Sequence, residues 1–108
     1  MASAPKTRNW SAWIDLMPGK APALHVRGKV ETNAGNFHPD LKEAVPQGIN
    51  PSILILDLTI VKKGEGGSDD VAYRDAIYDK PAKKGQYTEV HIRFGKDIIE
   101  KIKVTETH

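Results

Sequence analysis

The sequence predicts an all-β fold, because two kinds of evidence agree along the chain. Several segments alternate apolar and polar residues with a period of two, which is typical of strands with one face on a core and the other in water. Turn signals rich in glycine and proline separate these segments. Few of the segments have a pattern that suits a helix. About six or seven strands are expected, arranged as a β-sandwich or a small barrel. The immunoglobulin-like antiparallel sandwich is the commonest solution at this length and is the fold we predict.

The clearest strands lie at 23–31 and 87–94, where apolar and polar residues alternate without interruption. The segment 53–61 differs because both of its faces are apolar, so we expect a central strand covered on both sides. Asp57 is the exception within it, and it either faces outwards at a sheet edge or has a buried partner. Of these two alternatives we expect the exposed one.

Weaker patterns predict three further strands, at 9–16, 71–78 and 98–105. We expect the last of them to form a hairpin with 87–94 through a three-residue loop at 95–97. This register places Phe94 opposite Ile98 and sets Glu89 opposite Lys103 on the outer face. It also places Val90 opposite Ile102, so that the apolar side chains share one face.

A long connection at 33–51 separates two of these strands. Pro39 suits the first position of a helix, so we expect a helical turn after it that Val45-Pro46 would end. Leu41 and Val45 would hold this turn against the end of the sandwich. The simplest interpretation is a crossover between two sheets, and the alternative is a loop that binds a ligand or partner.

Length and composition bound the remaining choices. The 108 residues suit one domain spanning 1–108, with 1–8 as a flexible N-terminal arm. Cysteine is absent, which excludes disulfides and thiolate chemistry and favours the cytoplasm, or the periplasm if a leader was removed. No apolar run is long enough to span a membrane. The net charge of +2 is too small to predict nucleic-acid binding by itself.

No motif of a known catalytic type is present. His38 and Asp40, with Glu43 nearby, form the one local group of histidine and carboxylate. A metal site needs three or four converging ligands in a recognisable spacing, and none is found, so we predict no metal and no cofactor. A small metal-dependent or hydrolytic enzyme centred on His38 and Asp40 remains an alternative.

Residues 64–67, Gly-Glu-Gly-Gly, resemble the short GxGG loop of the chagasin-like inhibitors of cysteine peptidases. Those proteins are immunoglobulin-like domains of similar length. Their NPTTG-type loop and their Arg-Pro-Trp loop are missing from this sequence. We therefore assign no membership of that family, and a protease-inhibitor-like domain stays an alternative function.

Charge suggests one extended surface. His25, Arg27 and Lys29 share the outer face of one predicted strand, and His91 and Arg93 share that of another. If the two strands are neighbours, these side chains form a basic stripe that attracts phosphates or an acidic partner. A solvated face without a partner is the plainer interpretation. Nucleic acid is not expected, because the face has few aromatic residues on which bases could stack.

Trp10 and Trp13 lie three residues apart, so a strand sends them to opposite faces. Trp10 is the core candidate, and Trp13 is the exposed one that could anchor a partner. We predict a non-enzymatic binding module that uses the loops at the end of the sandwich and binds another protein. A weak homodimer through an edge strand or Trp13 is also expected. The candidate binding residues are Trp13, His25, Arg27, Lys29, His38, Asp40, His91 and Arg93.

Overall fold

A computed structural model describes residues 4–64 and 71–107, and within them the chain forms seven strands. The strands are β1 (Thr7–Asp15), β2 (Ala23–Thr32), β3 (Phe37–Glu43), β4 (Ile53–Lys62), β5 (Ala72–Pro81), β6 (Glu89–Phe94) and β7 (Asp97–Thr107). They make one mixed sheet in the order β3-β4-β6-β7-β1-β2-β5. The predicted all-β class and strand number are therefore confirmed.

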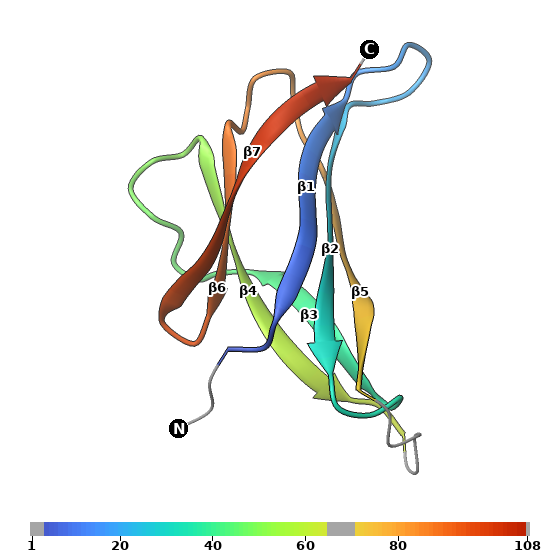
Figure 1. Cartoon of the computed structure of the whole chain (residues 1–108). Helices are drawn as coiled ribbons and strands as arrows, with labels where there is room; N and C mark the ends of the chain where they lie inside the picture. The colour runs from blue at the N-terminus through green and yellow to red at the C-terminus, as the bar shows by residue number, and fades with distance from the viewer. Residues whose placement is uncertain (1–3, 65–70, 108) are drawn as a thin grey trace.

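The sheet curls until it is nearly a barrel (Figure 1). Its two edge strands, β3 and β5, approach each other without a ladder of backbone hydrogen bonds between them. The pairs β1–β7 and β4–β6 are parallel and the others are antiparallel. The prediction of a wholly antiparallel fold was thus wrong in part. One continuous, mostly antiparallel sheet is not clearly an immunoglobulin-like sandwich.

The core fills the inside of this curled sheet. Alternate residues of β2 and β4 point inwards and are almost completely buried, as are those of β6. Trp10 packs against this core, as the sequence predicted, while Trp13 lies on the outer face of the same strand. The Trp10 ring lies directly over Gly28, where an added Cβ would be 2.2 Å from the ring atom Cε3. Glycine at this position therefore makes room for the indole.

The β6–β7 hairpin tests the register expected from the sequence. Val90 is opposite Ile102, and Glu89 is opposite Lys103, as predicted. Nearer the turn a bulge shifts the pairing by one residue, so that Phe94 faces Asp97 and the expected pair with Ile98 does not form. The turn is shorter than the predicted three residues, and Gly95 adopts φ 64°, a conformation that tight hairpin turns favour.

The connection at 33–51 contains a strand, which corrects the prediction of a crossover with a helical turn. β3 occupies its centre and pairs with β4, so the helical turn expected after Pro39 does not exist. Proline is tolerated here because β3 is an edge strand with one side free of pairing. Leu41 is buried in the core as expected, but Val45 is 90% exposed and holds nothing in place.

β4 is a central strand between β3 and β6, as predicted. Only its inner face, with Leu54, Leu56 and Leu58, is fully buried, so the expected cover on both sides is absent. Asp57 lies on the partly exposed outer face and accepts two hydrogen bonds from Arg93 on β6, at 2.7 and 3.1 Å. The carboxylate is therefore neither at a sheet edge nor deeply buried.

Candidate binding surfaces

The outer face of β1, β2 and β5 brings four of the predicted binding residues together. Trp13 of β1 is directly opposite His25 of β2, and Arg27 and Lys29 follow on the same face of β2. The period of two explains this grouping, because the residues between them point into the core. Each of the four side chains is partly exposed.

These side chains contact one another and a carboxylate from β5. The rings of Trp13 and His25 are 5.4 Å apart, and the Arg27 guanidinium lies 5.7 Å from the Trp13 ring. Asp79 bonds His25 Nδ1 at 2.7 Å and accepts a hydrogen bond from Arg27 at 2.8 Å. Burial acts to raise the pKa of Asp79, but the hydrogen bonds to Arg27 and His25 outweigh it and lower that pKa. The result is an ordered aromatic and ionic cluster on the sheet surface.

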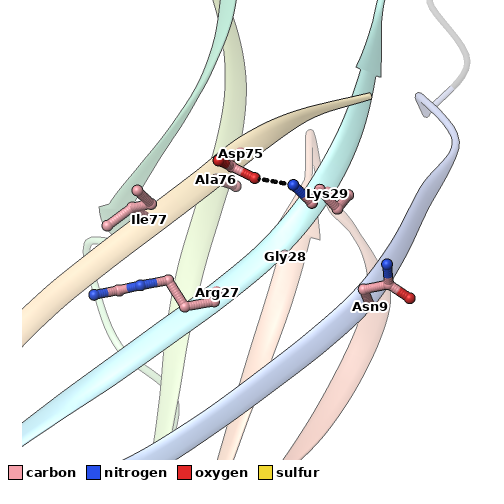
Figure 2. A pocket seen from close by; sticks show the side chains of 7 residues that line it. All are labelled: Asn9, Arg27, Gly28, Lys29, Asp75, Ala76 and Ile77. Carbon is pink, nitrogen blue, oxygen red and sulfur yellow. Dashed lines mark hydrogen bonds and ion pairs between the residues drawn. The ribbon is translucent and has the colours of Figure 1, made fainter. Parts of the chain in front are cut away.

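A shallow pocket of about 250 Å³ lies beside this cluster (Figure 2). Gly28 and Ala76 are paired across β2 and β5 and both face inwards, so the outer surface is hollow at that point. Arg27, Lys29 and Ile77 rise around the hollow, and Lys29 forms an ion pair with Asp75. The pocket is lined by Asn9, Arg27, Gly28, Lys29, Asp75, Ala76 and Ile77. Its charges are of both signs, which does not favour an anionic ligand.

The predicted basic stripe does not form, because β2 and β6 are not neighbours. β7 and β1 lie between them in the sheet, so His91 and Arg93 are on a different part of the surface from His25. Arg93 is held by Asp57, and these hydrogen bonds raise the pKa of Arg93. His91 lies 3.1 Å from a carboxylate oxygen of Glu89. Sequence alternation identified outward-facing residues but could not give the order of the strands.

His38 and Asp40 share the outer face of β3, whereas Glu43 lies on its inner face with Leu41. The three residues therefore do not converge. Among residues 4–64 and 71–107, no group of three or more histidine, cysteine, aspartate or glutamate residues is arranged to hold a metal ion. The geometry gives the alternative of an enzyme centred on His38 and Asp40 no support.

A polar cluster that the sequence did not suggest closes the gap between the edge strands. Tyr78 of β5 donates a hydrogen bond to Glu43 of β3 at 2.5 Å. Lys80 of β5 lies 3.3 Å from the same carboxylate and donates to the hydroxyl of Tyr87 at 3.0 Å. We call these four residues the seam cluster. Side-chain contacts thus connect β3 to β5, whereas backbone hydrogen bonds connect the neighbouring strands elsewhere in the sheet.

The pKa values in the seam cluster follow from these contacts. The hydrogen bond from Tyr78 lowers the pKa of Glu43 against an opposing effect of burial, and the charge of Lys80 lowers it further. Burial, then the bond to Glu43, raises the pKa of Tyr78. The bond to Tyr87 raises the pKa of Lys80. Each shift moves the pKa away from neutrality, which is the opposite of what general acid or base catalysis needs.

The loop between β3 and β4, residues 44–52, presents the most exposed apolar side chains of the described residues. Val45 is 90% exposed and Ile49 is completely exposed. The loop is nevertheless well fixed, because Gln47 donates to the carbonyls of Ala44 and Ile55 at 2.7 and 2.9 Å and accepts from the Ile55 amide at 2.9 Å. We call residues 44–52 the apolar loop. It projects from one side of the barrel in Figure 1.

Comparisons with known proteins identify no relative. No protein-family model matches the chain, no curated protein is similar to it, and no solved structure shares its fold at a significant level. No helix in the described part of the chain is long and apolar enough to cross a membrane. Residues 65–67 of the GxGG segment lie outside the described residues, so its resemblance to the peptidase inhibitors stays a prediction.

Proposed function

We propose that the protein is a non-enzymatic interaction module that binds another protein through the apolar loop. The observation that carries this proposal is the almost complete exposure of Val45 and Ile49 on a loop whose backbone is fixed. Large apolar side chains that are almost fully exposed on one short, ordered loop are typical of a contact surface.

The fixed loop conformation also supports binding. Association normally costs free energy because loops and side chains become ordered at the interface. Gln47 already ties the loop to Ile55, and the Asn50 side chain accepts from the Ser52 amide at 2.9 Å and hydroxyl at 2.7 Å. Little further ordering is required when a partner covers the two apolar side chains. The loop itself contains no charged residue, which suits a partner with an apolar groove.

The seam cluster and the cluster of Trp13, His25, Arg27 and Asp79 agree with a role other than catalysis. Their ionisable groups form ion pairs and hydrogen bonds with one another. The lowered pKa values of Glu43 and Asp79 keep these two carboxylates charged at neutral pH. A catalytic acid or base needs a pKa near the working pH. These clusters are best understood as contacts that hold the sheet and its surface in one conformation.

The proposal is tested by affinity capture from cells of the source organism with three tagged proteins. These are the unmodified chain, a Val45→Ser, Ile49→Ser double variant, and a control with Val71→Ser, which removes an exposed aliphatic side chain elsewhere. A specific partner should be captured by the unmodified chain and by the control but not by the double variant. Equal capture by all three proteins would refute a role for the apolar loop.

The affinity for the captured protein is then measured with purified components. Burying a valine or an isoleucine contributes about 1.5–3 kcal/mol for each side chain. The double variant should therefore bind at least about a hundredfold more weakly, since 1.4 kcal/mol corresponds to a factor of ten. Its melting temperature should remain unchanged, because both side chains are exposed in the free protein.

A further inference from the structure

The C-terminal strand changes its neighbour half-way along. From Asp97 to Lys103 β7 pairs with β6, and from Val104 to Thr107 it pairs with β1 in parallel. β1 begins at Thr7, but it pairs with β7 only from Ala12 onwards. Figure 1 shows the two strands side by side near the C-terminus and diverging towards the other end. We call the side of residues 97–103 that faces away from β6 the open edge.

The open edge has no hydrogen-bonded neighbour among the described strands. An unpaired edge presents a row of amide and carbonyl groups that can pair with another extended chain. Asp97, Ile98, Lys101 and Lys103 are all exposed along it. The unpaired length of residues 97–103 matches a typical strand, and adding a strand to such an edge is an established way of binding extended peptides.

Positive charge lines the outer face of the open edge. Lys101 and Lys103 are opposite His91 and Glu89 on that face, and neither lysine has an ion-pair partner within residues 4–64 and 71–107. The acidic residues of this segment, Asp97 and Glu100, are instead opposite residues of β6 that pack on the core. Residues 97–103 therefore carry two cations on their outer face that form no ion pair with the described residues, although Glu89 of β6 lies opposite Lys103.

Two further basic residues lie at the start of β1 and just before it. Lys6 and Arg8 are exposed and come from the stretch that precedes the β1–β7 pairing. The Arg8 guanidinium lies 3.9 Å from the centre of the Tyr73 ring, and Lys6 has no ion-pair partner in the described part of the chain. The Arg8 side chain therefore reaches across β2 to β5, away from β7, and the positive charge at the open edge itself comes from Lys101 and Lys103.

We propose that the open edge binds an extended acidic segment of a partner protein by strand addition. Backbone hydrogen bonds to residues 97–103 hold the segment in register. Carboxylates at every second position of the segment lie on the outer face beside Lys101 and Lys103, where opposite charges on neighbouring strands attract. The same lysines repel a second copy of this edge, so the surface selects an acidic partner over self-pairing.

The test uses a fluorescein-labelled peptide of alternating glutamate and valine that is as long as the open edge. Its binding at low ionic strength is measured by fluorescence anisotropy. The unmodified chain should bind it, and the Lys101→Glu, Lys103→Glu variant should bind about tenfold more weakly or worse, because two attractions become repulsions. Lys83→Glu, Lys84→Glu is the matched control, since it changes the net charge equally in the loop between β5 and β6, outside residues 97–103.

Two further measurements separate strand addition from simple charge attraction. A peptide with the same sequence but N-methyl groups on alternate amides should bind much more weakly, because it cannot complete the ladder. The amides of residues 97–103 should become protected from hydrogen exchange when the unmodified peptide binds. The Val45→Ser, Ile49→Ser variant should bind the peptide normally, because this surface is separate from the apolar loop.

Three results would overturn the proposal. They are a failure of the acidic peptide to bind, equal binding by the lysine variant and its control, and equal binding of the N-methylated peptide. Circular dichroism checks that the variants are folded. If the charge reversal prevents folding, the Lys101→Ala, Lys103→Ala variant is used instead. It should still bind the peptide more weakly than the unmodified chain, although the loss is smaller.

Discussion

Replacing Gly28 with alanine should destabilise the fold by forcing the Trp10 ring out of its place. An ideal Cβ at Gly28 would lie 2.2, 2.5 and 2.6 Å from three atoms of that ring. The nearest ring atom must move from 2.2 Å to the 3.4 Å at which ordinary contact begins. The strand itself is held firmly, because Gly28 is in the middle of β2 and is paired with Ala76. The indole therefore has to move.

The size of the effect follows from two opposing contributions. Overpacking a well-filled core costs about 1–3 kcal/mol. Removing a glycine from a strand recovers about 0.5–1 kcal/mol, because the unfolded chain loses freedom. The Trp10 indole N–H has no hydrogen-bond partner in the described part of the chain, so moving the ring costs packing alone. Because contacts of 2.2–2.6 Å are far too close, the overpacking cost lies in the upper part of its range. We expect Gly28→Ala to lower the free energy of unfolding by about 1–2 kcal/mol.

Urea unfolding followed by circular dichroism measures this loss, and a double-mutant cycle assigns it. Trp10→Leu removes the clash, so the double variant should be more stable than the two single losses predict, by about 1 kcal/mol or more. Gly48→Ala is the control, because its added Cβ would meet only the flexible end of Ile55, at 3.2 Å. Strict additivity, or a Gly28→Ala variant as stable as the unmodified chain, would refute the reasoning.

Two further predictions concern the edge strands. Leu41→Ala should lower the free energy of unfolding by roughly 2–3 kcal/mol, because Leu41 is only 6% exposed but lies on an edge strand that can partly close the cavity; a loss below about 0.5 kcal/mol in urea unfolding would contradict it. Tyr78→Phe should weaken the pH dependence of the melting temperature in both the acidic and the alkaline range. In the unmodified chain the lowered pKa of Glu43 contributes stability above its unfolded value near 4.5 that is lost as the pH falls. The raised pKa of Tyr78 contributes stability below its unfolded value of 10.0 that is lost as the pH rises. Identical pH profiles for the two proteins would exclude a stabilising role for the seam cluster.

Local patterns in the sequence predicted the parts of the fold that depend on neighbouring residues. The alternation in β2 and β6 identified which side chains face the core, and the β6–β7 register followed from matching their apolar residues. β3 was missed because Pro39 suits a helix start as well as an edge strand. Only the pairing with β4 decides between a helical turn and an edge strand, and residues 37–43 alone do not predict that pairing.

The order of the strands could not be predicted, and this limited the candidate site. His25, Arg27 and Lys29 were correctly placed on one outer face because they alternate along a single strand. The sequence did not predict that Trp13 lies beside them, because that contact depends on the pairing of β1 with β2. The predicted basic stripe failed because it required β2 and β6 to be neighbours. Asp79 was missed for a related reason, since it reaches His25 only through the pairing of β5 with β2. The sequence places Asp79 in a loop after the predicted strand.

The parallel pairing of β1 with β7 has a consequence for how the chain folds. β1 and β7 lie side by side although they are far apart in the sequence, so the sheet is continuous only after β7 has left the ribosome. The β1–β2 hairpin can form early, but the other edge of β1 remains unpaired until Val104 and the residues after it are available. Contacts between such distant parts of a chain slow folding. Until β7 arrives, β1 carries an unpaired edge beside a growing apolar surface, which makes this period the one in which misassociation is easiest.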